Sequence, residues 1–190
     1  MDELNKKWLG GELNFYFEYK RKIIENLIVG SCLNVGCGEH KIKNAINIDE
    51  NATNLPYKKN SFDTIILSDV IEHIEDWKKA VKEAIRVSKN QIIITVPAYM
   101  WLWSNYDREL GHYRRYIKKD FDKFLRKYQN ITYKVSYLFG AILPLIWLRK
   151  FTTGKTPKFP KFINDLLYFL SYIKLPFGST IMVKIKKNGC

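Results

Sequence analysis

Short apolar runs alternate with helical patterns along this chain, and the alternation limits the folds that it can adopt. Six runs are rich in Ile, Val and aromatic residues, as buried strands are: Cys32–Val35, Ala45–Ile48, Phe62–Leu67, Gln91–Val96, Ile131–Leu138 and Thr180–Ile185. Strands that alternate with helices favour a mainly parallel sheet with helices on both faces. The sequence therefore predicts an α/β fold.

Four segments have helical spacing of their apolar residues: Glu12–Leu27, Asp76–Val87, Asp120–Tyr128 and Phe162–Ile173. The chain of 190 residues contains no internal repeat and no low-complexity linker, so we expect one domain over residues 1–190. Within it, residues 140–178 are expected to form a mostly helical, apolar and basic cap before the last strand.

The charge of the chain is strongly positive. Thirty-two Lys and Arg residues against nineteen acids give a net charge of +13, which points to an anionic partner. Nine of the basic residues and one acid lie between Arg149 and Cys190. The helix expected at Phe162–Ile173 has one narrow polar stripe and a wide apolar face. Such a helix near Lys and Arg is typical of attachment to an anionic membrane surface, and the alternative is that it covers the sheet.

The three cysteines, Cys32, Cys37 and Cys190, form neither a disulfide framework nor a zinc motif, so we expect no metal site and a reducing, cytoplasmic environment. The polar N-terminus, MDELNKKW, does not resemble a signal peptide. The longest apolar stretch, Val135–Leu148, is shorter than the ~20 residues of a spanning helix and contains Pro144. We therefore expect no membrane span.

The first predicted strand ends in a glycine pair, Gly36 and Gly38, with one residue between them. At the carboxyl edge of a parallel sheet, such a turn leaves room where a side chain would block a ligand. The third glycine of the dinucleotide fingerprint is replaced by Lys41, and no Walker loop is present. The second strand ends at Asp49, where a carboxylate can accept both ribose hydroxyls. An ordinary tight turn remains the alternative.

Four segments in order resemble the class I S-adenosylmethionine-dependent methyltransferases. "LNVGCG" is similar to their glycine-rich first motif, "AINID" to the second strand with its acid, "NLPYKKNSFDTI" to the L-P-F-x-x-x-S-F-D segment, and "SDVIEHI" to the stretch after the fourth strand. The resemblance covers roughly Cys32 to Tyr116. It implies a Rossmann-like fold and S-adenosyl-L-methionine as the cofactor.

The resemblance also implies roles for individual residues. The glycine turn would meet the methionine part of the cofactor, Asp49 the ribose, the loop 51–55 the adenine, and Ser68 with Asp69 the floor beside the sulfonium. The residues assigned to the cofactor in this way are Asn34, Gly36, Cys37, Gly38, Asp49, Asn51, Ala52, Leu55, Ser68 and Asp69.

The chain departs from the family pattern in three places. Asn34 replaces the acid of the first motif, and Asn51 replaces the acid that reads the adenine. Asp49 follows Gly38 by eleven residues, where a strand–helix–strand unit needs about twenty. We therefore expect the first crossover helix to be a turn at most, and the second helix and the third strand of the family to be missing.

Methyl transfer to oxygen or nitrogen requires removal of a proton, which favours a histidine base. We expect His112 to be that base, with His73 in reserve and Asp107 beside it, and His40 to be a surface residue. "GHYRRY" resembles an element of methyltransferases found with surface-sugar and lipid assembly enzymes. In that interpretation the three residues that follow Tyr113 face the substrate: Arg114, Arg115 and Tyr116. The alternative is an arginine-rich loop held by salt bridges.

The leading hypothesis is an enzyme that methylates oxygen or nitrogen of a small-molecule, sugar-linked or lipid-linked acceptor. A second hypothesis is an RNA-directed methyltransferase or nucleic-acid binder, because the chain is basic and rich in aromatic residues. Against it, the sequence has no recognised RNA module and no Asn-Pro-Pro-Tyr type of base-flipping motif. A third hypothesis is a methyltransferase-fold protein without catalytic activity.

Overall fold

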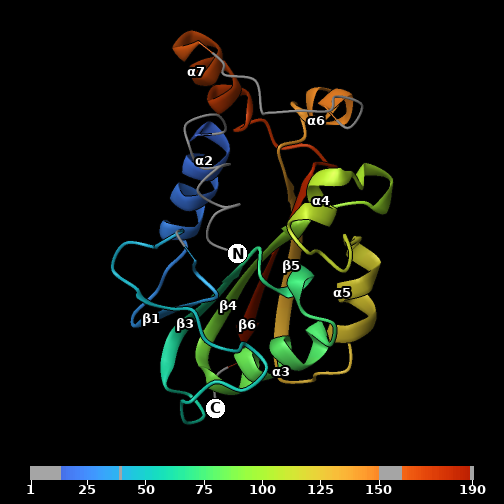
Figure 1. The fold of residues 1–190 in the computed structure, drawn as a ribbon. Helices are drawn as coiled ribbons and strands as arrows, with labels where there is room; N and C mark the ends of the chain where they lie inside the picture. Colours follow the sequence, from blue (N-terminus) through green and yellow to red (C-terminus); the bar gives the residue numbers. More distant parts are fainter. Residues whose placement is uncertain (1–13, 39, 150–159, 189–190) are drawn as a thin grey trace.

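The computed structural model describes residues 14–38, 40–149 and 160–188. Six strands form one sheet in the order β2-β1-β3-β4-β6-β5 (Figure 1). Their bounds are Cys32–Val35 (β1), Ile46–Ile48 (β2), Phe62–Ser68 (β3), Ser88–Pro97 (β4), Ile131–Leu138 (β5) and Thr180–Lys187 (β6). Strands β1 to β4 pair in parallel, and β6 is antiparallel to both of its neighbours. The predicted mainly parallel α/β sheet is confirmed.

The described helices are mostly short. They are Asn14–Glu25 (α2), Trp77–Val87 (α3), Asn105–Glu109 (α4), Lys118–Leu125 (α5), Leu143–Arg149 (α6) and Lys161–Leu170 (α7), with 3-10 turns at Ile71–His73 (η1) and Met100–Leu102 (η2). The N-terminal part of the first predicted helix and the basic segment 150–159 lie outside the described residues.

Side chains alternate between the two faces of the sheet, and helices cover both faces. On one face, Ile65 and Ile92 pack with Trp77 of α3 and Phe121 of α5. On the other face, Ile66 and its neighbours pack with Ile24 of α2. The central strands are buried on both sides, which explains their continuous Ile and Val runs.

The predicted loss of early elements is confirmed. The described residues between β1 and β2 form turns and bends, and residues 49–61 contain neither helix nor strand. Two asparagine side chains stabilise the shortened connection. The amide of Asn34 donates to the backbone oxygen of His40 (3.2 Å) and to Oδ1 of Asn47 (2.9 Å), and the Asn47 side chain in turn bonds the backbone of Ile42. These hydrogen bonds hold a turn where a crossover helix would otherwise connect the strands.

Helix α7 packs against α2 (Figure 1). Tyr19 of α2 meets the rings of Tyr168 and Tyr172 at 5.9 and 4.9 Å between centroids. Among the described residues, none of the helices has the length and apolar character needed to cross a membrane.

Candidate active site

The carboxyl ends of three neighbouring parallel strands lie at one edge of the sheet. Val35 is paired with Ile48 on one side and Leu67 on the other. The register therefore brings the residues that follow these strands, the glycine turn after β1, Asp49 after β2 and Asp69 after β3, to the same edge. This edge is the ligand crevice of open α/β sheets.

The two glycines of the turn have different surroundings. Both have a positive φ, +65° at Gly36 and +47° at Gly38. A Cβ atom on Gly36 would lie 2.9 Å from the side chain of Val70, whereas one on Gly38 would have no atom of the described residues within 4 Å apart from its chain neighbours. Packing therefore requires the first glycine, and the second lies beside open space. Between them, the backbone N–H of Cys37 donates to Ile48 of β2, which fixes the turn to the sheet.

Buried side chains anchor the loop after β2 to the main core. Asp49 is exposed, and the side chain of Asn51 closes a turn by accepting hydrogen bonds from Thr53. Ala52 and Leu55, predicted to contact the cofactor, are both about 97% buried in the main core. Their position indicates that they shape the loop from the inside, while Asp49 and Asn51 lie on its surface.

A lysine from α2 reaches the floor of the crevice. Lys20 is buried and forms an ion pair with Asp69, whose backbone N–H donates to Thr95 of β4. Burial lowers the pKa of Lys20 to about 8, and the carboxylate of Glu72 opposes that shift. Ser68, the other predicted floor residue, bonds the hydroxyl of Thr95 (2.9 Å). The carboxylate of Asp69 is therefore already paired with the ammonium group of Lys20.

Asp107 organises the segment after α4. It is fully buried, and its Oδ1 lies 2.9 Å from Nδ1 of His112 and 2.8 Å from Nε of Arg115. Its Oδ2 accepts from Nη2 of Arg115 and from the backbone of Ser104. Burial works to raise the pKa of Asp107, but the hydrogen bonds from His112 and Arg115 outweigh it and hold the pKa at about 2. The carboxylate is therefore ionised and fixes the orientation of the His112 ring.

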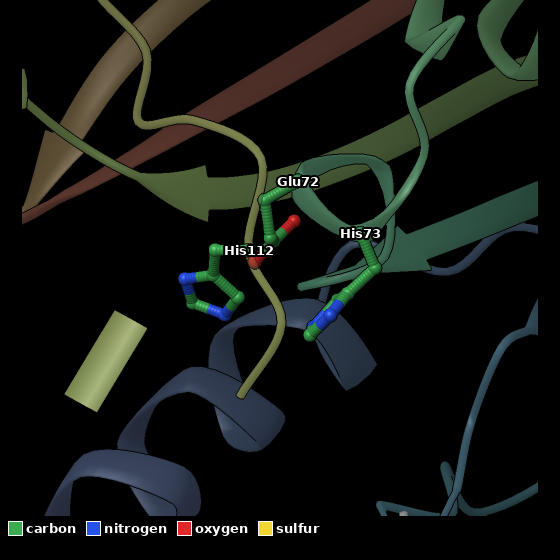
Figure 2. A group of neighbouring side chains, drawn as sticks. All are labelled: Glu72, His73 and His112. Atoms are coloured by element: carbon green, nitrogen blue, oxygen red, sulfur yellow. The ribbon is translucent and has the colours of Figure 1, made fainter. Parts of the chain in front are cut away.

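Glu72, His73 and His112, which we call the carboxylate–histidine cluster, lie together where η1 meets the segment after α4 (Figure 2). The rings of His73 and His112 are 4.6 Å apart between centroids. Burial lowers the pKa of His73 to about 4, helped by His112, so this ring is neutral at neutral pH. Burial raises the pKa of Glu72 to about 8. The two predicted catalytic histidines are thus brought together, with the buried carboxyl group of Glu72 beside them.

The residues after His112 make contacts inside the protein. The guanidinium of Arg115 binds Asp107, and Tyr116 is 99% buried with its hydroxyl donating to the backbone oxygen of Ile71 (2.9 Å). Arg114 is half-buried and lies over the ring of Tyr113. These contacts give Arg115 and Tyr116 a structural part in holding the loop, which was the alternative interpretation of the arginine-rich segment.

Three side chains at this edge were not predicted from the sequence: Lys20, Asn47 and Glu72. Glu72 stands next to His73 in "SDVIEHI", so its position was visible, but its burial was not. His40 is exposed, as predicted, and its ring stacks on Phe17 of α2 at 4.4 Å.

Comparison with known proteins finds similarity to methyltransferases. Residues 34–95 match the family model described as "Methyltransferase domain". The chain is 34% identical over 76 residues to norajmaline N-methyltransferase of Rauvolfia serpentina, a match that covers 40% of this chain and 24% of that protein. The chain thus spans about a quarter of the length of this curated relative.

Solved structures share the fold at low identity. A Thermotoga maritima structure described as a SAM-dependent methyltransferase, "possible histamine N-methyltransferase", has a TM-score of 0.56 at 19% identity, over 90% of this chain and 89% of that one. A plantazolicin methyltransferase solved with SAH has a TM-score of 0.56 at 13% identity, over 93% and 86%. These matches agree with the resemblance noted in the sequence: residues 34–95 match a methyltransferase domain model, and the chain shares the fold of S-adenosylmethionine-dependent methyltransferases.

Proposed function

We propose that this protein transfers a methyl group from S-adenosyl-L-methionine to an oxygen or nitrogen of a small or lipid-linked acceptor. The residues at the carboxyl edge suit this cofactor. Open space beside Gly38 accommodates its methionine part, and Asp49 is free to accept ribose hydroxyls. A sulfonium is a cation, and Ser68 and Asp69 place side-chain oxygens at the floor of the crevice, where Lys20 pairs with Asp69. When bound, the cofactor supplies an electrophilic methyl group whose carbon–sulfur bond breaks with its electron pair passing to sulfur.

The observation that most supports catalysis is the Asp107–His112 pair at the same edge. The Asp107 carboxylate accepts from Nδ1 of His112 and so directs the lone pair of the ring to Nε2. In Figure 2, one ring nitrogen of His112 points away from Glu72 and His73 and the other points toward them. In the simplest mechanism, His112 takes the acceptor's proton at Nε2 as the acceptor's lone pair attacks the methyl carbon, and Asp107 stabilises the imidazolium that forms.

Replacing His112 with alanine should lower turnover by ~100-fold or more, the usual effect of losing a base, and leave cofactor affinity unchanged. Turnover is measured as transfer of a radiolabelled methyl group into a cell extract that is then separated into aqueous and lipid phases. His40→Ala is the matched control, because His40 lies outside the cluster and stacks on Phe17. Full activity of His112→Ala would contradict the assignment, and a parallel loss of cofactor binding would make the residue structural.

The C-terminal cap supports an apolar or lipid-linked acceptor. Helix α7 buries Leu167 against α2, and Ser171 just after the helix is 98% buried, while a stripe of apolar side chains is exposed: Phe162, Leu166, Phe169 and Ile173. A groove of about 590 Å³ lies nearby, lined by Trp101, Trp147 and Phe177 among others, a size typical of ligand pockets. The exposed residues Lys161 and Lys174 adjoin this stripe in the sequence, and an apolar stripe flanked by basic residues suits an anionic lipid bilayer.

Vesicles of rising anionic lipid content should therefore sediment the protein increasingly, and added salt should release it. Each basic residue near the surface contributes about 1 kcal/mol. The double variant Phe162→Ser, Phe169→Ser should lose most of this binding, because both side chains are 70% exposed on α7. Val29→Ser removes an apolar side chain that is 56% exposed and distant from α7 in the sequence, and this variant should bind like the unaltered protein. Failure to sediment at low salt would indicate a water-soluble acceptor and no membrane contact.

A further inference from the structure

Glu72 is a buried acid whose partner is not evident from the protein alone. The residue is 99% buried, and neither of its carboxylate oxygens has a hydrogen-bond partner among the described residues. A buried carboxylate is costly unless it is paired, hydrogen-bonded or bound to a metal. The ammonium of Lys20 is near enough to interact with Glu72 electrostatically, but its ion pair is with Asp69. The carboxylate oxygens are therefore available to a further ligand.

The imidazole rings of His73 and His112 lie beside the carboxyl group of Glu72. One ligand atom from each of Glu72, His73 and His112 lies within 4.8 Å of the other two, and the side chains lie side by side in Figure 2. A shared ion would draw these atoms closer. Two imidazole nitrogens with one carboxylate oxygen form a common ligand set for divalent transition metals, whereas magnesium and calcium favour oxygen ligands alone.

Both histidines also have the outer partners that metal-bound histidines use. Such rings nearly always donate their second N–H to a carboxylate or a backbone oxygen, which fixes the ring and leaves the other nitrogen for the metal. Nδ1 of His112 lies 2.9 Å from the buried Asp107 carboxylate. The ring of His73 is hydrogen-bonded to the backbone oxygen of Leu110. Each ring therefore keeps one nitrogen for the cluster.

We propose that Glu72, His73 and His112 bind one divalent transition-metal ion, of the zinc, manganese or cobalt type, at the acceptor side of the crevice. No metal was expected from the sequence, because its cysteines and histidines form no closely spaced motif, whereas these ligands come from η1 and from the segment after α4. Three protein ligands leave coordination positions for water or an acceptor atom. Metal binding itself is independent of the proposed function. A catalytic role of the metal rests on the proposed methyltransferase function, and His112 would then act as a metal ligand and not as the base.

The test is equilibrium dialysis of the full chain, purified without a histidine tag and stripped with chelator, against Zn²⁺, Mn²⁺ or Co²⁺ alone. We expect about one bound ion per chain for at least one of them, and visible absorption bands with Co²⁺. Glu72→Gln and His112→Gln should each weaken binding by more than the ~10- to 100-fold that loss of an outer partner costs. His40→Gln, the third histidine of the chain, should bind as the unaltered protein does.

Absence of stoichiometric binding by all three ions would overturn the proposal, and so would binding that survives in both variants. Circular dichroism establishes that each variant is folded, and His73→Gln, at a half-buried position, replaces any variant that is not. Cofactor and acceptor are left out of this experiment, so its result is separate from that of the methyltransferase proposal. Methyl transfer that is unchanged when the metal is bound would confine the metal to a structural role and would show that Nε2 of His112, which the metal occupies, is not the base.

Discussion

Replacing Asp107 with alanine is expected to lower the free energy of unfolding by about 3 to 5 kcal/mol, the cost of leaving one partner of a buried ion pair without the other. The side chain of Asp107 is completely buried, and that of Arg115 is only 10% exposed. Without the carboxylate, the guanidinium keeps a hydrogen bond to the backbone oxygen of Ala98 but has no counter-charge. Urea denaturation measures the change.

The double variant Asp107→Ala, Arg115→Met is the control, because it leaves no buried charge and should regain much of the lost stability. The pH dependence has a defined sign. The pKa of Asp107 in the folded protein, about 2, lies below the ordinary value of about 3.9, so its contribution is complete above that value and is lost as the pH falls toward 2. A loss below about 1 kcal/mol in Asp107→Ala, the size of an exposed pair, would contradict this account.

Replacing Gly38 with valine is expected to raise the dissociation constant for S-adenosylmethionine by at least ~100-fold, equivalent to about 2.7 kcal/mol. The φ of +47° is disfavoured for a branched residue, and the new side chain would fill the open space where we place the methionine part of the cofactor. Gly111→Val is the matched control, because Gly111 has a φ of +70° and equally open surroundings but follows α4. Similar affinities of the two variants would show that backbone strain, and not occupation of the cofactor site, causes the effect.

Local patterns in the sequence were sufficient to predict the sheet. The runs Cys32–Val35 and Ile131–Leu138 are strands with the predicted bounds, because buried strands need continuous apolar residues. The eleven-residue spacing before Asp49 correctly predicted the missing crossover helix, since a helix and two turns do not fit in it. The edge at which the glycine turn and the acids meet follows from parallel pairing alone.

Contacts between distant segments were not predictable in the same way. Nothing in "SDVIEHI" indicates that Glu72 is buried or that His112 lies beside it, because the chain from α3 to α4 separates them. Likewise, the amphipathic pattern of Phe162–Ile173 does not tell which face turns inward. Leu167 packs with Tyr19 of α2, which leaves Phe162 and Phe169 on the exposed side of the helix.

Calorimetric titration of the unaltered protein with S-adenosylmethionine, followed by its demethylated product S-adenosylhomocysteine, tests the central claim most directly. We expect one binding site per chain for each, with the product displacing the cofactor, because both share the groups that the glycine turn and Asp49 would contact. Absence of binding by either compound, in a protein shown to be folded, would contradict the account and indicate a methyltransferase fold that no longer holds its cofactor.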